Sequence, residues 1–269
     1  MSRFQLLVIL SFVFLLGVLY FGFSTKTELQ SKEAQSRALS IESTGIQTLL
    51  SDAKSTLSPE QIVKIQGLEQ QVKDSSEEKD SKIESLKELS GRWYEYKHPA
   101  IAGFYAEEVA EMEENDEAWS IAGTTYAIGL KQSKEEKVRS YCLGRAVKSF
   151  ENAISLNPSN VDHQVNLAIC YTDSPPQDNP MKGILMLVDL NKKHPENVGV
   201  LTNLGRLAIQ TGQYEKAVQR LEKAVSIETE NPGPICLLAE AYQGLGKNEE
   251  AMTFLKKCQS FKQLQQVRN

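Results

Sequence analysis

The sequence contains few of the residues that carry catalysis or hold metal ions. Its 269 residues include three histidines and four cysteines, and no two cysteines form a C-x-x-C pair. Glycine-rich phosphate loops, H-E-x-x-H metal motifs, dinucleotide fingerprints and nucleophile elbows are also absent from it. We therefore expect no catalytic residues, no cofactor and no metal site, and a protein that is not an enzyme.

The histidines and the acidic residues fit structural roles better than catalytic ones. His98, His163 and His194 are scattered, and two of them precede proline at expected turns. Five glutamates lie between residues 107 and 114, and we expect them to form a solvated helix face, because charge runs usually face water. An enzyme with a hidden site is the competing hypothesis.

A basic excess is missing too. The net charge is -5, whereas nucleic-acid-binding proteins usually present a basic face, so we expect no nucleic-acid partner. Cys142, Cys170, Cys236 and Cys258 are expected to be small buried residues on helices. A disulfide between two of them stays open if the protein is exported.

One long apolar run is present at the amino terminus. Residues 4–23 contain 20 residues without a charge, and as a helix they would be roughly 30 Å long, which matches a bilayer core. The run is longer than the apolar region of a signal peptide. We expect residues 1–25 to be an uncleaved membrane anchor, with cleavage after Ser24 as the alternative.

The orientation of this anchor is not decided by the positive-inside rule, because Arg3 precedes the run and basic residues mixed with acids follow it. A very short tail before a first apolar helix is typical of a signal anchor. We expect a single-pass protein of the inner (cytoplasmic) membrane of a bacterium, with the rest of the chain in the periplasm. The alternative is a chain that faces the cytoplasm.

A polar stem is expected over residues 26–82. Ser58-Pro59-Glu60-Gln61 is a helix start with a capping box, and Ser75 is expected to cap a second helix. The apolar stripes of the stem need a partner surface, for which we favour the next helix of the chain. The competing hypothesis is a homo-oligomer in which two stems form a coiled coil.

The remainder of the chain is repetitive. Residues 198–231 contain two amphipathic helical patterns, and the same spacing returns 34 residues later. The matching positions are Leu204-Gly205, Ala208, Ala217, Leu221 and Ala224 in one copy and Leu238-Ala239, Tyr242, Ala251, Leu255 and Cys258 in the next.

This spacing resembles the tetratricopeptide repeat (TPR), a helix-turn-helix of 34 residues. The resemblance implies an all-α fold, a solenoid of TPR-type helical hairpins, here with an N-terminal transmembrane helix and a helical stem. We place the array over residues 83–269, with two insertions, around residues 131–139 and 172–180. The repeats are expected over residues 83–115 (degenerate), 116–160, 161–197, 198–231 and 232–265.

Packing explains the repeated small residues. Glycine or alanine at positions 123, 168, 205 and 239 lets the two helices of a repeat approach closely, and each repeat must stack on its neighbours to bury its apolar face. Asn179-Pro180 is expected to start a helix after the second insertion. The last helix, from Asn248, must expose its outer face, so we expect either polar residues or a partner there.

In the TPR family the first helix of each repeat lines the concave groove, so the resemblance implies a protein-binding groove. Its candidate residues in this chain are Tyr94, Thr124, Ile128, Asn166, Ile169, Asp173, Asn203, Arg206, Ile209, Gln210, Glu240 and Gln243. Arg206 is the only strong cation among them, so the set of Lys and Arg residues that grips a C-terminal carboxylate is missing.

The sequence thus favours a non-enzymatic, membrane-tethered TPR scaffold that binds protein partners, in bacterial cell-envelope biogenesis or assembly. The alternative is a cytoplasm-facing adaptor that docks a soluble enzyme or complex to the membrane.

Overall fold

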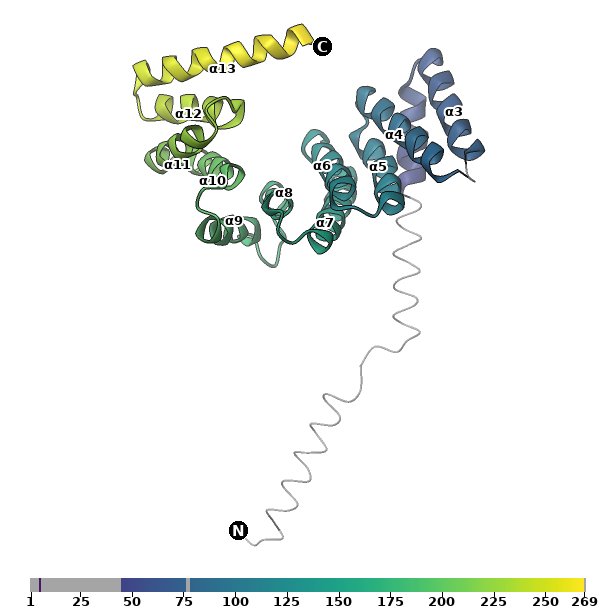
Figure 1. Cartoon of the computed structure of the whole chain (residues 1–269), viewed down its shortest axis with the longest axis horizontal. Coiled ribbons are helices and arrows are strands. Elements are labelled where there is room, and N and C mark those ends of the chain that lie inside the picture. Colours follow the sequence, from purple (N-terminus) through teal and green to yellow (C-terminus); the bar gives the residue numbers. More distant parts are fainter. Residues whose placement is uncertain (1–4, 6–44, 76–77, 269) are drawn as a thin grey trace. The chain divides into compact units, whose positions relative to one another are not determined.

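The computed structural model describes residue 5 and residues 45–75 and 78–268, and these residues form α-helices joined by short connections (Figure 1). No β-strand occurs in these ranges. The chain divides into two compact units, Met1–Ser55 and Thr56–Asn269. In the first unit, residues 45–55 are helical.

The second unit contains the helices on which the rest of the description depends. They are α3 (Pro59–Asp74), α4 (Lys79–Glu95), α5 (Pro99–Glu113), α6 (Asp116–Gln132), α7 (Glu136–Leu156), α8 (Val161–Asp173), α9 (Lys182–Lys193), α10 (Val198–Gln210), α11 (Tyr214–Ile227), α12 (Pro232–Gly244) and α13 (Asn248–Arg268).

Side-chain caps mark the starts of several of the described helices. The Ser58 hydroxyl accepts a hydrogen bond from the Gln61 backbone N–H, and the Gln61 side chain accepts one from the Ser58 N–H, so the capping box predicted for α3 is confirmed. Four further helices, α6, α8, α10 and α12, each begin after an asparagine whose side chain accepts a backbone N–H bond.

Two predicted helix starts are wrong. Ser75 ends α3 rather than starting α4, because its hydroxyl donates to the Gln71 carbonyl, and α4 begins after Glu78 without a side-chain cap. Asn179-Pro180 lies in a turn, in which the Asn179 carbonyl accepts from the Lys182 N–H, so α9 begins two residues later than predicted.

The helices pack as successive antiparallel pairs. The pairs are α4–α5, α6–α7, α8–α9, α10–α11 and α12–α13, and the second helix of each also contacts the first helix of the next (Figure 1). The first helices of neighbouring pairs meet as well, from α6 to α8, α10 and α12 in turn. We call the surface formed by α4, α6, α8, α10 and α12 the first-helix face.

Small residues at the seams confirm the packing prediction. A Cβ atom added at Gly123 of α6 would lie 2.8 Å from the Phe150 ring of α7, and one at Gly205 of α10 would lie 2.7 Å from Leu221 of α11. Both distances are far shorter than ordinary contacts. A Cβ atom at either position would therefore force the facing side chain of the neighbouring helix to shift.

The two insertions have different structures. Residues 131–139 add length to α6 and α7, which leaves only three residues between these helices. Residues 174–181 form the connection between α8 and α9. The predicted stem boundary at residue 82 falls inside α4, and α3 packs against α4, so the helix packing already begins at α3. The division into stem and array stays a prediction.

The predicted transmembrane segment, residues 4–23, lies outside the described residues apart from Gln5. Among the helices that the structure does describe, none is both long enough and apolar enough to cross a membrane.

Two of the cysteines differ from expectation. Cys236 of α12 and Cys258 of α13 form a disulfide, with their Cα atoms 5.0 Å apart, so the disulfide that the sequence left as an alternative is present for this pair. Cys142 and Cys170 are buried free thiols, as predicted.

The sequence predicted that the acidic run is a solvated helix face, and this prediction is wrong for Glu107. Ten residues of α5 are buried, because this helix is packed against α4, α6 and α7. Glu107 is only 4% exposed, and its carboxylate accepts hydrogen bonds from the Tyr126 hydroxyl at 2.9 Å and from Arg145 at 3.0 Å. The Lys148 ammonium lies 3.3 Å away on a half-exposed side chain, so the buried Glu107 carboxylate is paired with two cations.

Candidate functional site

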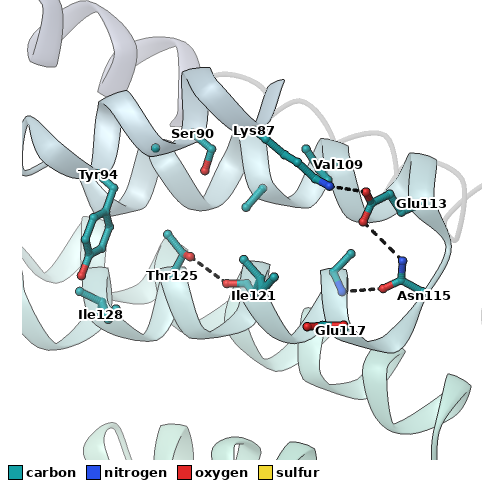
Figure 2. Close-up of a pocket in the computed structure, with 13 residues that line it drawn as sticks. Lys87, Ser90, Tyr94, Val109, Glu113, Asn115, Glu117, Ile121, Thr125 and Ile128 are labelled. Atoms are coloured by element: carbon teal, nitrogen blue, oxygen red, sulfur yellow. Dashed lines mark hydrogen bonds and ion pairs between the residues drawn. The ribbon is translucent and has the colours of Figure 1, made fainter. Parts of the chain in front are cut away.

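An open cleft of about 590 Å³ lies between α4 and α6, and residues of α5 form a third side of it (Figure 2). Its volume is in the range of protein sites that hold ligands. The cleft is lined by Lys87, Ser90, Gly91 and Tyr94 from α4, by Ala106, Val109 and Glu113 from α5, by the cap Asn115, and by Glu117, Ala118, Ile121, Thr125 and Ile128 from α6.

The spacing of these residues explains the shape of the cleft. Residues 87, 90, 91 and 94 lie on one face of α4, and residues 117, 118, 121, 125 and 128 lie on one face of α6. Gly91 adds no side chain, and a Cβ atom built there would meet nothing within 4 Å. The two helices therefore face each other across an open space, and α5 forms the third side of this space.

Exposed apolar side chains stand along the cleft. Ile121 is 56% exposed and Tyr94 is 45% exposed. In Figure 2, Tyr94 and Ile128 lie at one end, and Lys87, Glu113 and Asn115 lie at the other. Exposed apolar residues that gather in one hollow, with polar groups at its edge, are typical of interaction sites.

The polar end is held by a hydrogen-bonded set. The Lys87 ammonium donates to a Glu113 carboxylate oxygen at 2.6 Å, and the Asn115 amide lies 3.4 Å from the other oxygen. The hydrogen bond from Lys87 lowers the pKa of Glu113, so this carboxyl is ionised at neutral pH. The charge of Lys87 is thereby paired within the chain.

A second hollow of about 500 Å³ continues from the cleft toward α8. Glu117, Ile121 and Thr125 line both spaces, so the two hollows adjoin along α6, and we call them together the groove. The other lining residues of the second hollow are Asp116, Ser120, Thr124, Asn160, Asp162 and His163.

Asp116 connects two helix pairs at the edge of this second hollow. Its carboxylate lies 2.9 Å from His163 Nε2 and accepts a bond of 2.9 Å from the Asn157 amide. These hydrogen bonds, from His163 first, lower the pKa of Asp116. His163 is 3% exposed, so this histidine joins α6 to α8, which agrees with the structural role expected for it.

The structure brings together only some of the predicted groove residues. Tyr94 and Ile128 line the cleft, and Thr124 lines the second hollow. Glu240 and Gln243 line a separate hollow of about 450 Å³ on α12 and α13, beside the exposed Met252 and Leu255 of the last helix.

The remaining predicted residues lie on α8 and α10. The Arg206 guanidinium lies 3.5 Å from Asp173 and 3.4 Å from the Asn203 amide oxygen, so its charge is paired within the chain. Ile209 is buried in the core, and Ile169 packs against a neighbouring core cluster. Asn166 is half-buried and Gln210 is exposed. A binding role for these residues stays a prediction.

Sequence reasoning missed Ile121, Thr125 and Glu117, which join the two hollows. The spacing 121, 125, 128 was a usable signal, because it places these residues on the same face as the predicted Ile128. Lys87 lies two turns before the predicted Tyr94 on the same face of α4, so the same signal applied to it. Val109 and Glu113 could not be found in this way, since they line the cleft only through the packing of α5.

The site offers little chemistry beyond binding. Burial raises the pKa values of the Cys142 and Cys170 thiols to about 12, so neither is a thiolate at neutral pH. Within the described ranges, no three His, Cys, Asp or Glu side chains are grouped so that they could hold a metal ion.

The stacked helix pairs and the open groove define a helical-repeat protein of the interaction-scaffold class. A family model of the tetratricopeptide repeat matches residues 208–263, which extend from the end of α10 into α13. This part of the chain therefore matches the tetratricopeptide repeat, which confirms the resemblance seen in the sequence for these residues.

Similar proteins were found in sequence and in structure. The chain is 32% identical over 79 residues to cellulose synthase operon protein C of Pseudomonas fluorescens (strain SBW25), a match that covers 29% of this chain and only 6% of that protein. TTC0263, a thermophilic TPR protein of Thermus thermophilus, is 16% identical over 65% of this chain and 89% of its own, with a TM-score of 0.49. PilW, described as a type IV pilus biogenesis factor, is 18% identical over 66% of this chain and 76% of its own, with a TM-score of 0.46.

Proposed function

We propose that this protein is a membrane-tethered scaffold that binds protein partners in the groove formed by α4, α5, α6 and α8, and that it has no catalytic activity of its own. The observation that carries the proposal is the cleft between α4 and α6, where Tyr94 and Ile121 are exposed beside an open volume of about 590 Å³. Covering the apolar side chains of such a hollow lowers the free energy of the complex, because apolar surface is removed from water.

The tether is the uncharged run at residues 4–23, which has the length of a bilayer-spanning helix. The periplasm is our proposed compartment for the repeats. The Cys236–Cys258 disulfide supports it, because disulfides persist in exported proteins and are rare in the cytosol. A scaffold in this place would serve the biogenesis or assembly of the bacterial cell envelope.

Site-specific photo-crosslinking tests the groove. The crosslinker p-benzoylphenylalanine is placed at position 121 in the cleft, and at the exposed position 156 at the end of α7 as a control. We expect a crosslinked partner from position 121 that is absent from position 156. The same products from both positions would contradict the proposed groove.

A matched pair of variants separates occupancy of the cleft from effects on folding. Gly91→Leu fills the cleft from α4, whereas Gly144→Leu adds the same side chain to α7 outside the groove, and both glycines have open space around the added Cβ. Gly91→Leu should abolish the crosslink from position 121, and Gly144→Leu should leave it intact.

Reporter fusions after Asn269 test the compartment. Alkaline phosphatase is active when exported, so its activity supports periplasmic repeats. Fluorescence from a reporter that matures only in the cytoplasm would support the alternative, a cytoplasm-facing adaptor that docks a soluble enzyme or complex to the membrane.

A further inference from the structure

The groove across α6 has two halves of different chemistry. The half between α4 and α6 is mainly apolar away from its polar end, with Tyr94, Val109, Ile121 and Ile128 along it. The half between α6 and α8 carries the carboxylates of Asp116, Glu117 and Asp162, and no Lys or Arg is among the residues that line it. A partner that occupies the whole groove therefore contacts apolar side chains in one half and carboxylates in the adjoining half.

The acidic half keeps a net negative charge, because only one of its three carboxylates, that of Asp116, contacts a group that can become positively charged. Asp162 accepts only a long contact of 3.5 Å from the neutral Asn197 amide, and Glu117 is exposed. Asp116 is bound by His163 and Asn157, and it stays ionised at neutral pH because these bonds lower its pKa. The one lysine in the apolar half, Lys87, is already paired with Glu113.

The dimensions of the groove suit a short peptide segment. Eleven residues separate positions 117 and 128, so the lined part of α6 is roughly 16 Å long. An extended peptide covers this length with about five residues. The carboxylates disfavour polyanions such as nucleic acids and anionic lipid surfaces, because like charges repel.

We infer that the groove binds a short segment of a partner protein in which two or more aliphatic side chains stand beside a lysine or arginine. The aliphatic side chains cover Ile121 and Ile128 in the apolar half. The basic side chain reaches Glu117 and Asp162 in the acidic half. This inference rests on the proposed function, and it specifies the chemistry of the partner at the same site.

Selection from a random peptide library tests this chemistry. The full-length chain, purified in detergent, is immobilised, and phage that display random 12-residue peptides are selected on it. We expect the enriched peptides to carry two aliphatic residues and a Lys or Arg within about five residues of each other, and we expect their affinity to fall as the salt concentration rises.

Two variants assign the halves of the groove. Gly91→Leu should weaken the best peptide at least about tenfold by filling the apolar half. The double charge reversal Glu117→Lys, Asp162→Lys should also weaken it about tenfold and should shift a repeated selection toward acidic peptides. Two control variants carry changes at exposed positions outside the groove: Gly144→Leu and the double reversal Glu151→Lys, Glu215→Lys. These controls should change neither the affinity of the best peptide nor the sequences that a repeated selection enriches.

The outcomes separate the two proposals. Enriched peptides that lose affinity with Gly91→Leu but carry acidic residues or no charge would overturn the inferred partner chemistry and leave the groove in place. Peptides that are insensitive to Gly91→Leu, or no enrichment at all, would overturn both. Circular dichroism confirms that each variant is as helical as the parent chain.

Discussion

At the scale of single residues, several glycines lie where two helices approach each other closely, and these glycines are not equivalent. A Cβ atom at Gly183 of α9 would lie 2.5 Å from the Ala168 carbonyl oxygen and 2.6 Å from the Thr172 nitrogen, both backbone atoms of α8. Backbone atoms cannot rotate away as a side chain can. A methyl group at this position would therefore push α8 and α9 apart.

We predict that Gly183→Ala lowers the free energy of unfolding by about 1–3 kcal/mol, the usual cost of overpacking. Gly144→Ala is the matched control, because it sits inside α7 with open space around it. Gly144→Ala should raise the free energy of unfolding by about 0.5–1 kcal/mol, since alanine has a higher helix propensity than glycine. Thermal unfolding followed by circular dichroism measures both, and equal effects would contradict the packing argument.

The Asp116–His163 contact gives a prediction for pH. The pKa of Asp116 is lowered in the folded chain, so its ionised form stabilises the fold above the ordinary aspartate pKa of 3.8, and this stabilisation is lost as the pH falls through the lower, folded-state value. In Asp116→Asn the carboxyl is absent. The melting temperature of the parent chain should therefore exceed that of the variant near neutral pH, and the difference should shrink as the pH falls below 3.8.

The control for this titration is Glu151→Gln, which removes an exposed carboxylate from α7. The melting temperature of Glu151→Gln should stay close to that of the parent chain at every pH. A difference in melting temperature between the parent chain and Asp116→Asn that stays constant through acidic pH would mean that the carboxylate charge does not contribute to stability.

At the scale of helices, α12 and α13 are joined by a covalent bond as well as by packing. Among the described helices α13 packs mainly against α12, and Met252 and Leu255 on α13 are exposed. A helix of a repeat array that packs on one side only needs another source of stability. The Cys236–Cys258 disulfide supplies such a source by joining the two helices of the pair.

We predict that the double change Cys236→Ala, Cys258→Ala destabilises the α12–α13 pair by about 3 kcal/mol, because the disulfide closes a loop with a sequence separation of 22. Thermal unfolding with and without dithiothreitol measures the effect. Reductant should destabilise the parent chain and leave the variant unchanged. A parent chain that is insensitive to reductant at its melting temperature would contradict the prediction.

At the scale of the whole molecule, each helix pair contacts its neighbours, so stability is expected to be distributed by repeat. Ala217 is fully buried in a core cluster that extends from α10 to α13. Ala217→Leu should overpack this cluster and cost about 1–3 kcal/mol. Hydrogen exchange should speed up in α10 to α12 and stay unchanged in α4 and α5, and a uniform increase along the chain would indicate a single cooperative unit instead.

The sequence by itself determined the features that depend on local spacing. The 34-residue repeat, the capping box at Ser58 and the small residues at Gly123 and Gly205 all follow from helix periodicity and from contacts within one helix pair. These interactions join residues close in sequence or at a fixed offset, so a pattern can reveal them. Of the predicted groove residues, Tyr94, Ile128 and Thr124 were found in the same way, by their position on a first helix.

Only the tertiary structure decided which polar groups are buried and where the groove opens. Glu107 is typical of a solvated helix face in the sequence, yet it is buried because α5 is packed on several sides by α4, α6 and α7. Arg206 stands out as a free cation in the sequence, yet Asp173 pairs with it from the preceding first helix. Contacts of this kind join residues 33 to 38 positions apart, where no local pattern specifies the partner, so burial and pairing follow from how neighbouring helix pairs stack.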